Sequence, residues 1–223
     1  MARMPRVVVP GFPHHVTQRG NRRQKTFFCD DDYRYYIQLL SESIVISQTK
    51  IWAYCLMPNH IHLIMVPEED NGLRVALGEA HRRYTRHINF REGWRGHLWQ
   101  ERFHSFVMDE SYLLSAVRYV ERNPVAAGLC RHPADWPWSS AAAHLGGVDD
   151  DLVTVKPMLD RVNDWESYLI ESQESHEAHQ SIRLHSRTGR PLGDSQFIES
   201  LESLTGKTLA PKRPGRKPAG SSG

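Results

Sequence analysis

Cysteine is scarce in this 223-residue sequence, and the three that occur, Cys29, Cys55 and Cys130, lie far apart. Their odd number and wide spacing argue against a disulfide framework and against a Cys-x-x-Cys metal site. Long apolar runs are also missing. None approaches the roughly 18 residues of a membrane span, and Val7-Val8-Val9 ends at Pro10-Gly11, too early for a signal segment. We therefore expect a cytoplasmic protein with one compact core and appendages.

A large excess of charge of one sign is lacking as well, since the formal net charge is +2. The charges are nevertheless unevenly placed. Residues 1–144 carry 18 basic and 14 acidic side chains, residues 145–180 carry 2 and 9, and residues 181–223 carry 8 and 3. An acidic stretch thus separates two basic regions. We expect these two basic regions to bind a polyanion such as nucleic acid.

Hydrophobic periodicity predicts an α+β fold. Asp30-Asp31-Asp32 is typical of a helix start, Pro58-Asn59 of a turn between two strands, and Pro124 of a helix end. The order β-α-β-β-α-β-α is a split β-α-β plan, with an antiparallel sheet and helices on one face. The predicted elements are extended segments at 7–9 and 15–18, helices at 30–49, 72–90 and 110–123, and strands at 51–57, 60–66 and 99–108.

The second half of the chain changes in character at Gly146-Gly147 and Asp149-Asp150-Asp151. We expect a core domain at 1–145, an acidic connector at 146–180 and a mostly polar, basic extension at 181–223. Within the extension, an amphipathic segment at 197–204 suggests a small DNA-binding module. The tail Pro214-Gly215-Arg216-Lys217-Pro218 resembles the Gly-Arg-Pro segments that enter A·T-rich minor grooves.

The clearest candidate site is the histidine pair in Met57-Pro58-Asn59-His60-Ile61-His62-Leu63. Residues i and i+2 of a strand point to the same face, so His60 and His62 present both imidazoles to one point. Imidazole suits Mn, Zn, Fe or Ni better than Mg, but Mg²⁺ or Mn²⁺ is also held when an oxygen ligand and a substrate phosphate complete the shell. The alternative is an ordinary polar strand face in a protein that has 13 histidines.

A predicted helix adds a possible nucleophile to this pair. Tyr119 and Asn123 lie four residues apart and share a helix face, where Asn123 can offer its amide oxygen to a metal. A nearby cation lowers the pKa of a tyrosine hydroxyl and polarises a phosphodiester, which favours attack by Tyr119 on phosphorus. The alternative is that Tyr119 is a core residue and that Asn123 caps the helix before Pro124.

Several motifs, in the right order over roughly residues 3–145, resemble the REP-associated tyrosine transposases. These are single-tyrosine enzymes of the His-hydrophobe-His nuclease group, and an ordered set of motifs is far more specific than any one of them. The motifs are Pro13-His14-His15-Val16-Thr17-Gln18-Arg19-Gly20-Asn21, Tyr54-Cys55-Leu56-Met57-Pro58-Asn59-His60-Ile61-His62-Leu63, Leu98-Trp99, Arg118-Tyr119-Val120-Glu121-Arg122-Asn123-Pro124-Val125 and Trp136-Pro137-Trp138-Ser139-Ser140.

The resemblance implies a ferredoxin-like catalytic domain at 1–145 that cleaves and rejoins single-stranded DNA near repetitive extragenic palindromes, through a 5′-phosphotyrosine. It implies that His60, His62 and Asn123 bind Mg²⁺ or Mn²⁺ and that Tyr119 is the nucleophile, with Tyr84 as the rival. Two other functions stay open: a metal phosphodiesterase that uses water, and a non-catalytic protein that only binds the hairpins.

The expected partner is single-stranded hairpin DNA in the bacterial nucleoid, bound by a monomer or a homodimer. Phosphate contacts come mainly from basic and polar side chains, although any single arginine here is as readily explained as solvated surface charge. The candidate DNA-binding residues are Arg19, Asn21, Arg22, Arg23, Arg82, Arg83, Arg86 and Arg102.

Overall fold

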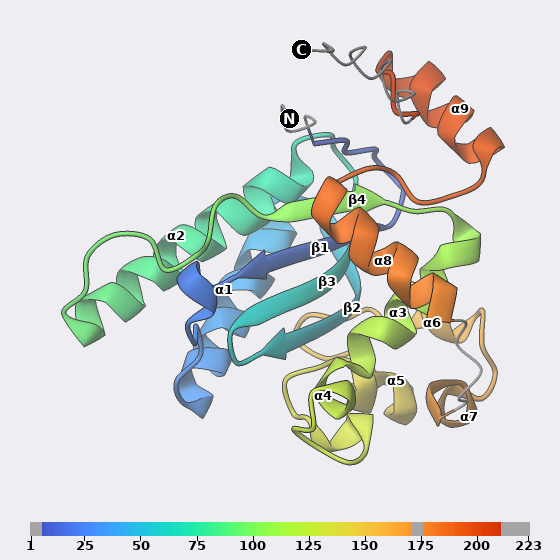
Figure 1. Cartoon of the computed structure of the whole chain (residues 1–223). Coiled ribbons are helices and arrows are strands. Elements are labelled where there is room, and N and C mark those ends of the chain that lie inside the picture. The colour runs from blue at the N-terminus through green and yellow to red at the C-terminus, as the bar shows by residue number, and fades with distance from the viewer. Residues whose placement is uncertain (1–5, 171–175, 211–223) are drawn as a thin grey trace, which may run out of the picture.

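A four-stranded antiparallel sheet forms the centre of the protein (Figure 1). The computed structural model describes residues 6–170 and 176–210. The strands lie in the order β2-β3-β1-β4, with one helix after β1 and another after β3. This is the split β-α-β, ferredoxin-like arrangement, so the expected α+β fold is confirmed. The strands are β1 (His14–Arg19), β2 (Thr49–Met57), β3 (His60–Pro67) and β4 (His104–Val107).

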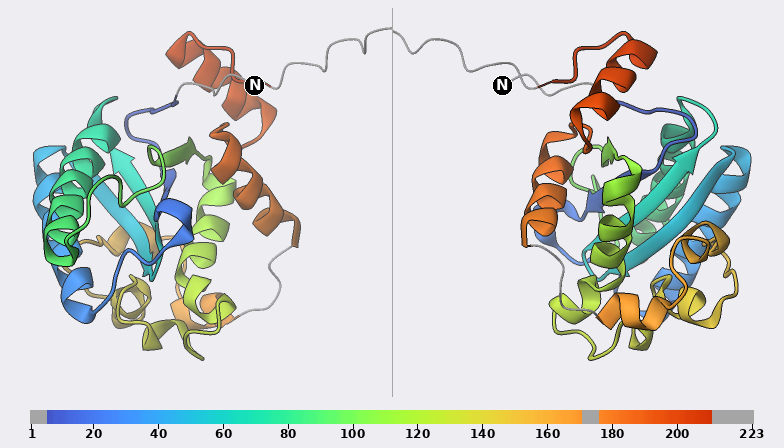
Figure 2. Two further views of the ribbon diagram at one scale, coloured as in Figure 1. Left: turned by 60° about the vertical axis from the view of Figure 1, so that its left-hand side comes forward. Right: turned by 90° about the vertical axis from the view of Figure 1, so that its right-hand side faces the viewer.

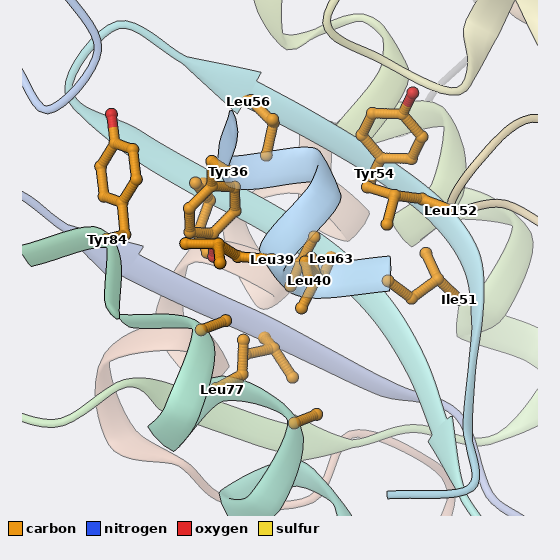
Figure 3. Packing of buried hydrophobic residues seen from close by; sticks show 14 of the residues in the cluster. Tyr36, Leu39, Leu40, Ile51, Tyr54, Leu56, Leu63, Leu77, Tyr84 and Leu152 are labelled. Carbon is orange, nitrogen blue, oxygen red and sulfur yellow. The ribbon is translucent and has the colours of Figure 1, made fainter. Parts of the chain in front are cut away.

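Two helices, α1 (Asp30–Ile46) and α2 (Gly72–Glu92), cover one face of the sheet. Alternate side chains of β2 and β3 are apolar on this face and form one core with the buried sides of both helices (Figure 3). The start of α1 is tied to the end of α2, because the buried Asp32 carboxylate pairs with Arg91. The same carboxylate accepts a hydrogen bond of 3.3 Å from the backbone N–H of Cys29, the N-cap residue, as part of a capping box that begins α1.

The opposite face of the sheet is also covered, which corrects the expectation that helices lie on one face only. α3 (Glu110–Glu121), α7 (Trp165–Ile170) and α8 (His176–Thr188) lie on this side. Figure 2 shows α3 and α8 across the sheet from α1 and α2. The strands need an apolar cover here too, because they bury apolar side chains on this face, among them Ala53, Cys55, Met57, Ile64 and Phe106.

Several element boundaries differ from those predicted. β4 is shorter than the strand predicted at 99–108, because Glu101 has a φ of 56° and this left-handed conformation interrupts an extended backbone. The helix predicted at 110–123 ends at Glu121 and is followed by α4 (Asn123–Ala126). Pro124 begins that new helical turn, where its missing N–H costs nothing, rather than simply ending the first helix.

A buried carboxylate anchors the C-terminal end of α3. Glu121 is fully buried, and its Oε1 accepts hydrogen bonds from Ser140 Oγ at 2.5 Å and His144 Nδ1 at 2.6 Å. Its Oε2 accepts from Trp165 Nε1 at 3.0 Å. The helix that carries Tyr119 is therefore fixed to α5 (Ala141–Gly146) and to α7 through one side chain.

Residues beyond 145 pack against the core rather than apart from it. They join the sheet through two isolated backbone bridges, Ile51 with Val153 and Met108 with Leu192. The amphipathic segment predicted at 197–204 is helical in α9 (Ser195–Thr205), which buries Leu201 against the N-terminal segment. The short elements not named so far are η1 (Asn21–Arg23), η2 (Pro133–Asp135) and α6 (Lys156–Leu159).

The division of the chain at 145 and 180 stays a prediction. Residues 171–175 of the acidic connector and the tail from 211, including Pro214-Gly215-Arg216-Lys217-Pro218, lie outside the described residues. In the rest of the chain, no helix combines the length and the apolar character needed to span a membrane.

Candidate active site

Strands β1 and β3 place polar side chains on the sheet face that α3 and α8 cover. His60 pairs with Arg19, and His62 pairs with Thr17, so these four side chains share one face. His15 lies two residues before Thr17 on the same face, diagonal to His62. The ring centroids of His60 and His62 are 4.9 Å apart. The i, i+2 spacing in the sequence thus brings the two imidazoles together as expected.

Hydrogen bonds orient the His60 ring. His60 Nδ1 is 2.6 Å from Asn59 Oδ1, and Asn59 is itself held by a hydrogen bond of 3.2 Å from its Nδ2 to the Arg23 carbonyl. An amide oxygen only accepts hydrogen bonds, so His60 Nδ1 must carry the proton. The lone pair of His60 is therefore on Nε2, the nitrogen that a metal would use.

Burial keeps the site histidines neutral. It lowers the pKa of His60 to about 4, and the positive charge of Arg19 acts in the same direction. Burial also lowers the pKa of His62 well below its ordinary value, with smaller contributions from His60, His15 and Arg19. The pKa of His15 falls to about 3 for the same reason. Neutral imidazole is the form that binds a metal ion, so the pair is in its ligand form at pH 7.

Tyr119 and Asn123 face this histidine pair from α3 and the start of α4. The Tyr119 ring is half-buried, and its centroid lies 5.6 Å from that of His62 and 6.1 Å from that of His15, with both pairs edge to face. Asn123 Nδ2 is 3.5 Å from His62 Nε2. The tyrosine hydroxyl group, two imidazoles and an amide thus belong to one site, built from β1, β3 and the α3–α4 segment.

The potential metal ligands of this site, His60, His62 and Asn123, fit a divalent metal ion that is bound by few protein groups. In the part of the chain that the structure describes, no group of three or more His, Cys, Asp or Glu is placed to hold a metal. Two imidazoles and the Asn123 amide remain, so oxygens of water or substrate would complete the coordination. A closed structural zinc site, with four protein ligands, does not match this set.

These residues open into a strongly basic cavity of about 600 Å³. Two of its arginines come from β1 and η1, and two come from α8, where Arg183 and Arg187 are one helical turn apart. Burial lowers the pKa of Arg19, the nearby Arg23 and Arg187 add to this effect, and Tyr119 opposes it. The lining residues are Thr17, Gln18, Arg19, Arg23, His60, His62, Gln100, Glu101, His104, Tyr119, Asn123, Arg183, Ser186 and Arg187.

Tyr84, the rival nucleophile, lies on the other side of the sheet. Its side chain is fully buried in the core beneath α1 and α2 (Figure 3), and its hydroxyl donates a hydrogen bond of 2.7 Å to the Thr26 carbonyl. Burial raises the pKa of Tyr84, with a smaller contribution from Asp32. The structure therefore separates Tyr84 from the histidine pair and leaves Tyr119 beside it.

The predicted DNA-binding residues divide between two surfaces. Arg19 and Arg23 line the cavity, and Asn21 and Arg22 belong to the same short element, η1. The exposed Arg102 follows Glu101, another lining residue. The α2 arginines lie across the sheet from Tyr119: Arg82 pairs with Glu79, Arg83 pairs with Glu42, and Arg86 is exposed.

The contribution of α8 to the cavity was not predicted from the sequence. Arg183, Ser186 and Arg187 lie in a segment assigned only to a basic extension, far from the histidine motif in the sequence. The three- and four-residue spacings of these side chains predict a shared helix face, which was the available signal. His15 was also missed as a site residue, although it lies within one of the motifs described above.

The sequence of this chain is similar to those of known transposases. Residues 9–123 match the family described as Transposase IS200 like. The chain is 30% identical over 99 residues to a putative REP-associated tyrosine transposase of Haemophilus influenzae. That alignment covers 40% of this chain and 56% of the relative, so the chain spans about half the length of the curated relative that it matches.

Two solved structures were matched, and the first is similar in fold. The structure of a REP-associated tyrosine transposase bound to a REP hairpin has a TM-score of 0.57 and 22% sequence identity, and it covers 69% of this chain and 92% of that chain. A putative transposase from Deinococcus radiodurans has a TM-score of 0.38 and 18% identity, with 54% and 97% covered. The family match extends over more than half of the sequence and contains His60, His62, Tyr119 and Asn123. The chain therefore belongs to the IS200-like transposase family.

Proposed function

We propose that this protein is a metal-dependent endonuclease and strand transferase that acts on single-stranded DNA at REP hairpins. One observation carries the proposal: the Tyr119 ring and the His60–His62 pair share one cavity that four arginines also line. Such a cavity combines a candidate nucleophile, candidate metal ligands and the positive charge that a phosphodiester needs. Since the substrate is chromosomal, we expect the protein to act at the bacterial nucleoid.

In the proposed reaction, the Tyr119 oxygen attacks the scissile phosphorus and the bond from phosphorus to the 3′ oxygen breaks. The products are a 5′-phosphotyrosine and a free 3′-hydroxyl, and the proton lost by the phenol balances the one gained by the leaving oxygen. In the rejoining step a DNA 3′-hydroxyl attacks the phosphotyrosine and releases Tyr119. Because the phosphotyrosine bond conserves the energy of the broken bond, no ATP is needed.

The metal would be Mg²⁺ or Mn²⁺, held by His60, His62 and Asn123. Bound there, the ion would polarise the phosphodiester and favour the phenolate form of the tyrosine. His60 supports this assignment, because its hydrogen bond to Asn59 leaves the lone pair on Nε2. The cavity arginines, Arg19 and Arg187 among them, would bind the DNA backbone.

The hairpin substrate is proposed from two relatives. One relative is named a putative REP-associated tyrosine transposase, and a solved transposase of similar fold is bound to a REP hairpin. The basic cavity of this chain is consistent with such a ligand, since phosphate contacts dominate the affinity for nucleic acid.

The test is to incubate the full chain with Mn²⁺ and a labelled single-stranded REP hairpin, and to look for a denaturation-resistant protein-DNA adduct. We expect an adduct with the wild type and none with Tyr119→Phe, which should still bind the hairpin. The matched control is Tyr84→Phe, which also removes one tyrosine hydroxyl but on the far side of the sheet. An adduct that survives in Tyr119→Phe would contradict the proposal.

The same experiment distinguishes the two other functions. A metal phosphodiesterase that uses water would cut the hairpin without an adduct and would keep this activity in Tyr119→Phe. A protein that only occupies hairpins would shift their mobility without cutting them.

A further inference from the structure

A chain of hydrogen bonds runs from α8 through β1 to the candidate metal ligand His62. Ser186 Oγ is 2.8 Å from the Ile182 carbonyl and 3.3 Å from His15 Nδ1. His15 Nε2 is in turn 3.0 Å from His62 Nδ1. The two imidazole planes are almost parallel, with an interplanar angle of 10°, and the side chains are only 1% and 6% exposed.

The carbonyl at one end determines the direction of every hydrogen bond in this chain. The Ile182 carbonyl can only accept, so the single hydroxyl proton of Ser186 is donated to it. The Ser186 oxygen must then accept from His15, which places the His15 proton on Nδ1. A neutral imidazole carries one N–H, so His15 Nε2 accepts from His62 Nδ1. The lone pair of His62 is consequently on Nε2.

His62 Nε2 is the ring nitrogen that faces Asn123. It lies 3.5 Å from Asn123 Nδ2. His60 reaches the same state by a different route, through Asn59. Both imidazoles therefore present an unprotonated Nε2. In His62 this follows from hydrogen bonds with residues on two other elements, His15 on β1 and Ser186 on α8.

We propose that Ser186 and His15 hold His62 in the tautomer that presents Nε2 to a divalent metal ion. Both are positioning residues, because they act only through His62. The role in metal binding rests on the proposed function, but the tautomer of His62 is a property of the metal-free protein. It also assigns a role to α8, which lies beyond the residues 9–123 that match the family.

The test is a long-range ¹H–¹⁵N spectrum of the full chain with ¹⁵N-labelled histidine, recorded without metal or DNA. The His62 signals are assigned by their absence in His62→Gln. In the wild type we expect His62 to be protonated on Nδ1 and unprotonated on Nε2. Mn²⁺ affinity, measured by electron paramagnetic resonance, gives a second readout.

Ser186→Ala removes the group that sets the direction of the hydrogen bonds. We expect its His62 signals to move toward a mixture of tautomers and its Mn²⁺ affinity to fall about tenfold. Ser186→Thr keeps the hydroxyl and should restore both. Ser203→Ala is the matched control, because Ser203 makes the same hydrogen bond to the carbonyl four residues earlier, but on the exposed side of α9.

Protonation of His62 on Nε2 in the wild type would overturn the proposal. So would a Ser186→Ala variant with unchanged His62 signals and Mn²⁺ affinity. Either result would leave the proposed function intact as long as the wild type forms the Tyr119 adduct, and the adduct assay alone decides that.

Discussion

Tyr119 lies edge to face with His62, with the ring centroids 5.6 Å apart and the ring planes at 87°. The two residues come from different elements of the same chain, α3 and β3. Asn123 and His60 adjoin them in the same cavity. The candidate nucleophile and the candidate metal ligands are therefore brought together within one copy of the protein.

This arrangement predicts that two inactive copies do not complement each other. When Tyr119→Phe is mixed with His60→Ala, we expect no adduct above the sum of the separate variants, because each chain lacks part of its own site. The measurement is adduct formation at several protein concentrations. Recovery of activity in the mixture would show instead that Tyr119 of one copy serves the histidines of another.

Metal removal should separate chemistry from binding. We expect a chelator to abolish the adduct while hairpin binding changes little, because the arginines rather than the metal supply most of the affinity. His60→Ala should lower Mn²⁺ affinity at least tenfold, by removal of a ligand. Calorimetric titration with Mn²⁺ measures this, and re-addition of Mn²⁺ to the chelated wild type is the control. Full activity in the chelated protein would contradict the metal assignment.

The two arginines of α8 should contribute to DNA binding without reading its sequence. Arg183→Ala and Arg187→Ala are each expected to weaken hairpin binding and to reduce the slope of log K against log salt by about one. Filter binding at several salt concentrations measures the slope. Arg34→Ala, on the exposed side of α1, is the control, and Arg82→Ala tests whether the α2 surface takes part. Unchanged slopes for both α8 variants would exclude this role.

The buried carboxylate of Glu121 should be important for stability. Glu121→Ala leaves Ser140, His144 and Trp165 without their acceptor, and we expect a loss of about 3 kcal/mol in the free energy of unfolding. Urea denaturation measures it. Glu110→Ala, on the same helix but in an exposed ion pair with Arg161, should cost less than about 1 kcal/mol. Similar losses in the two variants would contradict the interpretation.

Acid should destabilise the protein through its buried histidines. Burial lowers the pKa of His14 from 6.5 to about 4, so the unfolded chain takes up a proton there before the folded chain does. Stability from this residue is complete above pH 6.5 and is lost as the pH falls toward 4, by about 3 kcal/mol. We expect the pH dependence of urea unfolding to become shallower in His14→Gln. His97→Asn, at an exposed position, is the control, and an equal slope in His14→Gln would reject the prediction.

Much of this architecture follows from local patterns in the sequence. The hairpin at Pro58-Asn59 and the i, i+2 spacing of His60 and His62 depend on neighbours along the chain, and both are found as predicted. The second layer of helices was not predicted. The order of elements led us to expect helices on one face only, whereas Cys55 and Ile64 are buried on the face opposite α1 and α2.

The choice between Tyr84 and Tyr119 illustrates the difference between what local sequence patterns predict and what tertiary packing decides. Both lie on helices next to arginines, and only the tertiary structure places Tyr84 in the core and Tyr119 in the cavity. The same is true of Arg82 and Arg183. Each is a basic residue of the kind that binds DNA phosphates, but α2 and α8 cover opposite faces of the sheet.

The sequence by itself determined the order of elements, the histidine pair and the helical spacing of Tyr119 and Asn123, because each depends on residues within a few positions of one another. Only the tertiary structure decided which tyrosine lies beside the histidines. It also decided that Ser186, 124 residues beyond His62 in the sequence, is linked to His62 by hydrogen bonds through His15. Such contacts depend on how helices pack across a sheet, and no local pattern in the sequence records which face a distant helix will cover.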